Sequence, residues 1–481
     1  MRKILKYSWF IGILAFPSCS SWLDVDPFDQ VSEKQQYEKA EGFYNQLNGI
    51  YKVIASKDLY GKELTWGFLD VLAQYYDMTS YSNCKNTGYL EGAALKYEQE
   101  YVKPYFDSFW EKHYNVIANC NNLIQNVAVA DSVLFPRREV ERRCIEGEAR
   151  ALRAMLHFDL LRMYAPAPKV DVAGKYMPYV DVFPTHIPLN ISTKEILENI
   201  QHDLSVAYAL TADQDTLYKG AISDISKRLE LQTGTLPRFL NYRGYRLNHY
   251  AIKALMARVA LYEGDKETAI NMASDVIKYR NWFKFTNKYY AEKKNNIKLY
   301  DDVLFALYNN NLTLYESEEN TGDSWMTAWD YNALFATDGS KDLRRLQWGK
   351  DKDGSYVPLK YKKIEEIGDK GKICNIMIPM IRLSEMYYIL AECYYEIDKA
   401  KAKEYLQVVR KARQCVSQLP EAKNQSEFNE LITKEFRREH FGEGQLFFYY
   451  KRLGLDAIGG GDTKIRYGSK FVFPIPQSND I

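Results

Sequence analysis

The sequence predicts a mainly α-helical protein in which pairs of helices form a scaffold and long irregular segments run between them. Apolar residues recur at helical spacing over most of the chain. Hydrophobic residues make up 46% of the 481 residues, which is enough to bury a large core. Three stretches lack this spacing and are rich in Asn, Asp, Gly and aromatic residues: 57–103, 211–247 and 281–375. Irregular segments of this length in a compact domain are usually functional.

The first half of the chain is expected to hold four helices. These are residues 33–55, 104–127, 137–164 and 192–210. In the first of them, Phe43 and Leu47 recur on one side at helical spacing. Pro166 ends the third helix, and a capping box of Ser192 and Glu195 begins the fourth. A few short strands can lie between these helices.

The second half is expected to hold two helix pairs, residues 248–278 and 382–413. The first pair turns at Gly264 and the second breaks near Asp398. Ala257, Gly264 and Ala269 occupy the small-residue spacing of a tetratricopeptide helix pair, in which the two helices cross closely. The second pair keeps Ala391 but lacks the turn glycine. The pairs are therefore tetratricopeptide-like and form a degenerate scaffold rather than a regular solenoid.

The N-terminus has the features of an export signal. Arg2 and Lys3 precede a short apolar run, WFIGILAF, which is too short to span a bilayer. Cys19 follows in a context that resembles the lipobox of bacterial lipoproteins, where the thiol is acylated and becomes the first residue. We expect residues 1–18 to be a signal peptide and 19–481 to form a single domain with the three loop-rich insertions. The alternative is an ordinary secretory signal with an unrelated thiol.

Charge and motifs exclude several classes of function. The formal net charge is +1, which does not favour a nucleic-acid partner. The sequence has no phosphate-binding loop, no zinc-protease helix and no serine-nucleophile elbow. Its 6 His and 7 Cys show no metal-ligand spacing. We expect no catalytic residue, metal or cofactor, although a pair of glycosidase carboxylates is a spatial feature that sequence does not reveal.

Two charged clusters are expected to be structural. Arg150 and Arg153 lie near Glu146 and Glu148 on one predicted helix, as in a solvated face or a brace between helices. A second cluster, Glu435 to Glu439, has the same interpretation. His157, beside Phe158 on an apolar face, is expected to be a packing histidine rather than a ligand or base.

Four stretches in register along the chain carry a resemblance to a known family. They are residues 19–27 (CSSWLDVDP), 148–165 (EARALRAMLHFDLLRMYA), 382–392 (RLSEMYYILAE), and 432–478 with Arg437-Arg438-Glu439, Gly442-Glu443-Gly444 and Phe473-Pro474-Ile475-Pro476. Together they resemble the SusD/RagB family, the surface glycan-binding lipoproteins of Bacteroidota. The chain departs from the family pattern at Gln445 and at Tyr449-Tyr450. These positions concern scaffold packing more than ligand contact.

The resemblance implies a fold and a function. The fold would be a SusD-like α-α superhelix, and the protein would be lipid-anchored at Cys19 in the outer membrane and exposed at the cell surface. It would capture an oligosaccharide and deliver it to a SusC-like TonB-dependent transporter without breaking a bond. One alternative is a surface helical-repeat lipoprotein that binds peptides or assembles a complex. Another is a surface glycosidase.

Sugar rings are recognised by aromatic platforms together with planar hydrogen-bonding groups. Residues 65–83 and 323–332 have that composition, and they lie roughly where relatives build the ligand platform. The candidate ligand-binding residues are Trp66, Tyr76, Asp77, Tyr81, Asn83, Trp325, Trp329 and Tyr331. For each ring the alternative is an anchor that holds its loop in the core, and Trp66 could instead pack on Phe68 and Leu72.

Overall fold

The fold is described here from a computed structural model. It describes residues 33–78, 84–184, 188–229, 241–293, 295–319, 331–336, 341–350, 354–365, 369–458 and 464–476. The predicted signal peptide and Cys19 therefore lie outside the described residues. Within these ranges, every helix falls short of the length or the apolar character that a membrane crossing requires.

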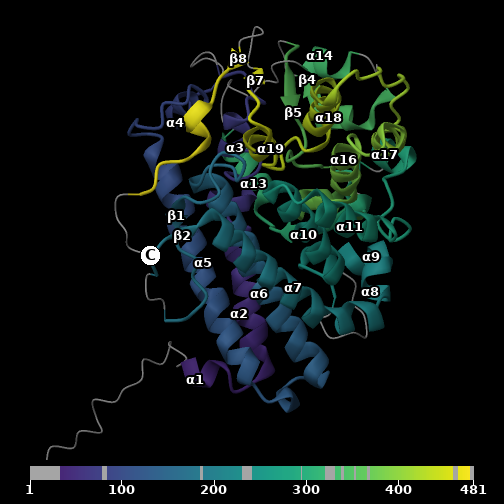
Figure 1. The fold of residues 1–481 in the computed structure, drawn as a ribbon. Coiled ribbons are helices and arrows are strands. Elements are labelled where there is room, and N and C mark those ends of the chain that lie inside the picture. The colour runs from purple at the N-terminus through teal and green to yellow at the C-terminus, as the bar shows by residue number, and fades with distance from the viewer. Residues whose placement is uncertain are drawn as a thin grey trace, which may run out of the picture.

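Within the described ranges, eight helices of at least 12 residues pack in chain order to form the scaffold (Figure 1), and α18, of 15 residues, lies beside them. They are α2 (Ala40–Ile54), α5 (Lys103–Val129), α6 (Arg138–Tyr164), α7 (Thr193–Leu217), α10 (His249–Glu263), α11 (Lys266–Ile277), α16 (Leu383–Tyr394) and α17 (Lys399–Ala412). Each packs against the next one in this order along the chain. The result is a continuous layer of helices, which confirms the predicted mainly α fold class.

The α6 helix lies inside this layer and is buried along most of its length. It packs against α5 and α7, and some of its charged residues pair with neighbouring helices while others pair within α6. Arg153 Nη2 donates to Asp203 Oδ1 of α7 at 2.7 Å, and Glu148 accepts from the Tyr51 hydroxyl of α2 at 3.0 Å. The charged cluster on α6 is therefore a brace between helices, one of the two predicted interpretations.

The two predicted helix pairs are confirmed as α10–α11 and α16–α17. Gly264 ends α10 with a φ of +97°, a left-handed conformation that glycine adopts without strain. Asp398 caps α17 by accepting from the Lys401 N–H at 3.0 Å. Ala257 and Ala269 are fully buried where the first pair crosses.

The stretches expected to be irregular contain more short elements than the sequence indicated. The α7 helix runs on to Leu217, beyond the predicted end at residue 210. The additional elements are η2 (Lys57–Gly61), α3 (Phe68–Leu72), α4 (Thr87–Ala93), α8 (Gly220–Ser223), α9 (Ile225–Leu229), η5 (Arg243–Tyr245), α12 (Lys288–Lys293), η6 (Tyr300–Asp302), α13 (Leu312–Glu319), α14 (Tyr331–Phe335), η8 (Leu343–Gln347) and α15 (Asp369–Ile376). Elements this short are stabilised by tertiary contacts rather than by their own periodicity.

The described strands form two-stranded antiparallel sheets. The pairs are β1 (Lys175–Met177) with β2 (Ile191–Ser192), β3 (Val303–Tyr308) with β6 (Met377–Arg382), β4 (Trp348–Lys350) with β5 (Tyr356–Pro358), and β7 (Ala457–Ile458) with β8 (Lys464–Ile465). In the β3–β6 pair, Val303 lies opposite Arg382 and Tyr308 opposite Met377. This pair brings the third irregular stretch against the start of α16.

The remaining elements lie at different ends of the layer, with α1 at the bottom of the view in Figure 1 and α18 and α19 in its upper part. They are α1 (Glu33–Gln36), η3 (Ser132–Leu134), α18 (Gln425–Glu439), α19 (Leu446–Leu453) and η10 (Gly468–Phe471). In Figure 1, α3, α14, α18, α19 and the β4–β5 hairpin gather in the upper part of the view, above α5, α6 and α7. One large hydrophobic cluster runs from α2 to Phe473 and joins this end to the helical layer.

Candidate functional site

The predicted site residues, which are the lipid-attachment residue Cys19 and the candidate ligand-binding residues, fall into three groups in the structure. Cys19, Tyr81, Asn83, Trp325 and Trp329 lie outside the described residues. Trp66, Tyr76 and Tyr331 are buried, with exposed fractions of 4%, 0% and 6%. Asp77 is half-buried, near the end of a described range.

Trp66 and Tyr76 anchor their loop in the core. The Trp66 Nε1 donates to the Gly61 carbonyl at 3.1 Å, and its ring stacks on Tyr361 with centroids 5.4 Å apart. The Tyr76 hydroxyl donates to the Trp66 carbonyl at 2.8 Å. Because neither ring face is open, the structure favours the anchoring alternative for both residues over a stacking platform.

Tyr331 is also packed rather than open. Its ring stacks on Tyr356 of the β4–β5 hairpin with centroids 3.5 Å apart. The Arg345 guanidinium lies over the same ring, 5.5 Å from its centroid. Tyr331 therefore fixes α14 to the hairpin.

The two predicted regions are joined by a run of aromatic rings centred on Phe441. Tyr75 and Tyr76 of the first region contact Phe441, with centroids 5.3 and 6.1 Å away. Trp348 lies 4.0 Å from Phe441 on the other side and contacts Tyr331 of the second region at 6.1 Å. Residues far apart in sequence are thus brought to one end of the molecule by a shared aromatic core.

The α18 helix lies between the same two regions. The Tyr75 hydroxyl donates to the Arg437 carbonyl at 2.8 Å. From the other side, Arg438 Nε donates to the Leu334 carbonyl of α14 at 2.6 Å. The structure therefore brings together at α18 the first predicted region and α14, the helix that begins at Tyr331 in the second region.

A cleft of about 590 Å³ opens at this junction. Its lining comes from α14, α18, α19 and the segment that follows α19: Ala333, Leu334, Glu430, Thr433, Lys434, Arg437, Tyr450, Gly454, Leu455 and Asp456. Glu430 and Asp456 are exposed, and Lys434 is half-buried. Carboxylate, ammonium and hydroxyl groups of this kind hydrogen-bond sugar hydroxyls. We take this cleft, the α18 cleft, as the candidate site.

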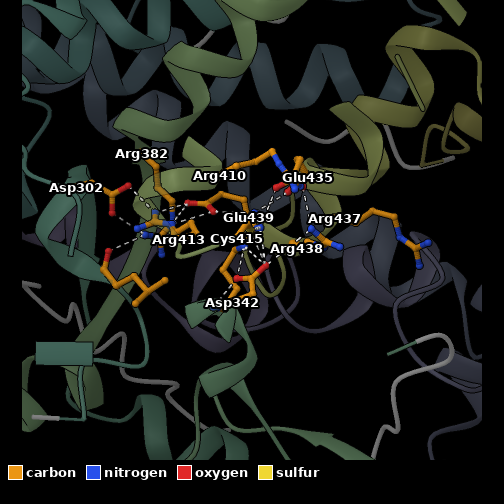
Figure 2. Close-up of polar contacts among 12 residues, drawn as sticks. Asp302, Asp342, Arg382, Arg410, Arg413, Cys415, Glu435, Arg437, Arg438 and Glu439 are labelled. Carbon is orange, nitrogen blue, oxygen red and sulfur yellow. Dashed lines mark hydrogen bonds and ion pairs between the residues drawn. The ribbon is translucent and has the colours of Figure 1, made fainter. Parts of the chain in front are cut away.

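A buried network of ion pairs joins α18 to η8, to α17 and to Arg413 at the end of α17 (Figure 2). Glu435 accepts from Arg344 Nη2 and from Arg438 Nη1, both at 2.8 Å. Arg413 joins α17 to both α18 and η6 by pairing with Glu439 and with Asp302, the latter at 2.7 Å. The predicted structural interpretation of the Glu435 to Glu439 cluster is confirmed, because these groups are buried and paired.

The ion pairs and the burial of this network shift the pKa values of its carboxyl groups. Burial alone would raise the pKa of the Asp342 carboxyl, but Arg344 beside it brings the pKa below its usual range. Asp302 shows the opposite balance, because burial raises its pKa to about 6 despite Arg413 and Arg382. Both carboxyls have close guanidinium partners, which is the pattern of a structural network.

The Gly442-Glu443-Gly444 segment packs against the first predicted region and holds it in place through a hydrogen bond and a close backbone contact. The Gly442 N–H donates to Asp70 Oδ2 at 2.7 Å. A side chain at Gly444 would place a Cβ 1.9 Å from the Leu64 carbonyl oxygen, so only glycine permits this approach. Glu443 Oε1 accepts from Arg382 Nε at 2.7 Å and from Lys360 Nζ at 2.6 Å. These two cations bring the pKa of the Glu443 carboxyl to about 2, although burial alone would raise it.

The sequence did not indicate several lining residues of the cleft. Lys434, Tyr450 and Asp456 belong to helices or turns whose composition is ordinary, and no local motif marks them. One signal was available, because Lys434, Arg437, Tyr450 and Asp456 all lie in the fourth stretch that resembles the family, and Tyr450 is one of the positions at which the chain departs from the family pattern. Within the described ranges, no group of His, Cys, Asp or Glu side chains is arranged to hold a metal ion.

Comparisons with known proteins give a consistent result. A family described as starch-binding and associating with the outer membrane matches residues 21–261, and the SusD family matches residues 244–472. A SusD-like protein P2 from Formosa agariphila is 20% identical over 97% of this chain and 74% of its own length.

Solved structures show the same fold. A SusD superfamily protein from Bacteroides thetaiotaomicron has a TM-score of 0.66 and 23% identity, with 92% of this chain and 97% of that chain covered. A SusD-like carbohydrate binding protein from Bacteroides vulgatus has a TM-score of 0.68 and 16% identity, with 92% and 95% covered. The similarity therefore extends over nearly the whole fold.

Proposed function

The chain belongs to the SusD family, and from this premise we propose that it captures an oligosaccharide at the cell surface and passes it to a SusC-like TonB-dependent transporter. The family described as starch-binding supports a glycan as the ligand class. In this proposal the protein binds and hands over its ligand without breaking a bond. Acyl chains on Cys19 would hold it at the outer membrane, and more than one chain is needed for stable anchoring.

The observation that carries the proposal is the meeting at α18 of the first predicted region and α14, which begins in the second region. Tyr75 of the first region and Leu334 of α14, two residues beyond the second region, both bond to that helix. The α18 cleft lies where they meet and is lined by polar groups on an apolar floor. Such a site suits a ligand with many hydroxyls and an apolar ring face. Trp325 and Trp329 are proposed to add the aromatic platform, and Tyr81 and Asn83 to add polar contacts.

Calorimetry with oligosaccharides and affinity electrophoresis with polysaccharides would test this proposal. We expect Trp325→Ala to weaken binding about three- to tenfold, since a stacked ring contributes about 0.5–1.5 kcal/mol. Lys434→Ala should also weaken binding. Tyr289→Ala and Lys194→Ala are matched controls, because both residues are exposed and lie outside the cleft. Saturable peptide binding without any glycan signal, or reducing ends released from the polymer, would contradict the proposal.

The proposed lipid anchor on Cys19 is tested by a separate experiment. We expect Cys19→Ser to abolish labelling with radioactive palmitate and to move the protein from the outer-membrane fraction to a soluble one. Cys415→Ser is the matched control, because this thiol lies in the described fold, far along the chain from the lipobox. Wild-type protein that carries no fatty acid, or that keeps residues 1–18 in intact-mass spectrometry, would contradict the anchor.

A further inference from the structure

A second cleft, of about 730 Å³, lies on another part of the molecule. It is formed by the C-terminal end of α2, by η5 and by the connection from β3 to α13, and it shares no lining residue with the α18 cleft. Neither predicted ligand region contributes to it. We call it the β3 cleft.

Aromatic rings line much of the β3 cleft. Tyr242, Tyr245, Tyr308 and Tyr315 all belong to the lining. The Tyr308 ring is 40% exposed, and its edge-to-face contact with Tyr245, at 5.7 Å between centroids, holds its orientation. An exposed ring fixed by a buried neighbour provides a flat apolar face at little cost in conformational entropy.

The polar part of the lining is built from amides. Asn309, Asn310 and Asn311 follow Tyr308 directly at the end of β3, and Asn48 lies opposite them on α2. Asn309 is fixed in place, because its Nδ2 donates to the Ala55 carbonyl and its Oδ1 accepts from the Asn311 N–H. Asn310 and Asn311 are exposed. Side-chain amides next to an exposed ring suit the hydroxyls and the apolar face of a sugar unit.

The charge of the β3 cleft is one-sided. Lys52 and Arg246 belong to the lining, and the described lining has no carboxylate. Arg246 Nη1 forms an ion pair with Oε2 of the buried Glu148, at 3.4 Å. Lys52 is exposed on α2. No carboxylate among the described lining residues offsets its positive charge.

The floor of the cleft is rigid. Glu148 accepts from the Tyr51 hydroxyl at 3.0 Å, and that hydroxyl accepts from the Leu247 N–H at 2.9 Å. The Arg246 guanidinium lies 5.0 Å from the centre of the Tyr51 ring. A pre-organised floor of this kind reduces the ordering cost of binding.

From these features we propose that the β3 cleft is a second saccharide site, selective for an anionic sugar unit that carries a carboxylate or a sulfate. Tyr308 stacks on the sugar ring, Asn310 and Asn311 bond its hydroxyls, and Lys52 pairs with the anionic group. The inference deepens the proposed function, on which it rests, by naming the substrate class. Its failure can be told apart from failure of that function, because neutral sugars are assayed in parallel.

The test is calorimetry on the full chain at low and at physiological salt. The probes are hexagalacturonic acid for the carboxylate, a chondroitin sulfate hexasaccharide for the sulfate, and maltohexaose as the neutral sugar. We expect an acidic probe to bind more tightly than maltohexaose and to lose affinity as salt screens the charge. Lys52→Ala should weaken that binding about fivefold, Lys52→Arg should keep it, and Tyr308→Ala should weaken it for either acidic probe.

Two matched control variants test whether these effects are specific to the β3 cleft. Lys39→Ala removes an exposed lysine just before α2 and outside the cleft, and Tyr101→Ala removes a ring that is 62% exposed elsewhere. Both should leave the affinities unchanged, as should Lys52→Ala for maltohexaose. Equal affinity for neutral and acidic probes would overturn the inference while leaving the proposed function in place. So would acidic-sugar binding that responds to Trp325→Ala but not to Lys52→Ala. The absence of any glycan binding would overturn both proposals.

Discussion

His157 is held in the core as a neutral ring by one donor and one acceptor. Its Nδ1 lies 3.0 Å from the Arg153 carbonyl, to which it can only donate, and its Nε2 accepts from the Val180 N–H at 3.0 Å. The ring also stacks on Tyr179, with centroids 3.9 Å apart. This arrangement confirms the packing histidine that the sequence indicated, since a second ring proton would face the Val180 N–H.

The neutral state of His157 makes the stability of the protein dependent on pH. Burial, together with nearby Arg153, lowers the pKa of His157 from 6.5 to about 3. Between these values the unfolded chain binds a proton that the folded chain does not. The free energy of unfolding should therefore fall below pH 6.5, by about 1.4 kcal/mol per pH unit for this group. Above pH 6.5, His157 does not make the free energy of unfolding depend on pH.

Urea unfolding at pH 7.5, 6.0 and 5.0 would measure this effect in His157→Gln. Glutamine also carries one donor and one acceptor, but it does not titrate. The variant should lose less stability than the wild type between pH 7.5 and 5.0. The control is His202→Gln, because His202 is exposed on α7. Identical pH slopes for His157→Gln and the wild type would show that His157 does not carry the effect.

The aromatic residues show which residue roles a sequence can indicate. His157 could be interpreted correctly because Phe158 and the other apolar residues near it in sequence mark a buried face of the predicted helix. Trp66 and Tyr76 could not, because their burial depends on Tyr361 and Phe441, which lie far along the chain. Composition indicates that a loop is aromatic, but it does not indicate which way a ring points. The α18 cleft was missed for the same reason.

At the scale of elements, the start of α7 is defined by a reciprocal cap. Ser192 Oγ accepts from the Glu195 N–H at 3.2 Å, and Glu195 Oε2 accepts from the Ser192 N–H at 2.8 Å. Two backbone donors that the first turn leaves without helical partners are thereby satisfied. The capping box that the sequence predicted is confirmed, and it sets the register in which α7 packs against α6.

Ser192→Ala should lower the free energy of unfolding by about 1 kcal/mol, because it removes the acceptor for the Glu195 N–H. Chemical denaturation monitored by circular dichroism would measure the change. Ser205→Ala is the matched control, since Ser205 is exposed in the interior of the same helix and alanine favours helical backbone there. Equal losses in the two variants would contradict a specific capping role.

Elements with strong periodicity or capping signals were predictable, and elements held by distant contacts were not. The boundaries of α5, α6, α10 and α11 follow from apolar spacing and from Gly264. The β3 strand lies in a stretch expected to be irregular, although its run from Val303 to Leu307 is apolar and fully buried. Its pairing with β6 decides its conformation, and that partner lies about seventy residues further on.

At the scale of the whole molecule, the C-terminal segment ties the two halves of the chain together. The Phe473 N–H donates to the Met163 carbonyl at the end of α6, at 2.9 Å. Its ring, 1% exposed, packs against Phe106 of α5 at 4.7 Å and against Phe447 of α19 at 5.5 Å. The C-terminal segment is thus packed into the same core as α5, α6 and α19, while the single domain expected for residues 19–481 stays a prediction.

Because the C-terminal segment packs into this core, we predict that the protein unfolds as one unit. Phe473→Ala should destabilise the fold by about 3–5 kcal/mol, because it leaves a cavity where α5, α6 and α19 meet. In scanning calorimetry we expect the variant to show a single transition, shifted to lower temperature, with the calorimetric enthalpy still equal to the van't Hoff enthalpy. Ile475→Ala is the matched control, because Ile475 is two residues further on and 41% exposed. If Phe473→Ala instead split the transition in two, the halves matched by the two family descriptions would be separate folding units, and the prediction of one domain would be wrong.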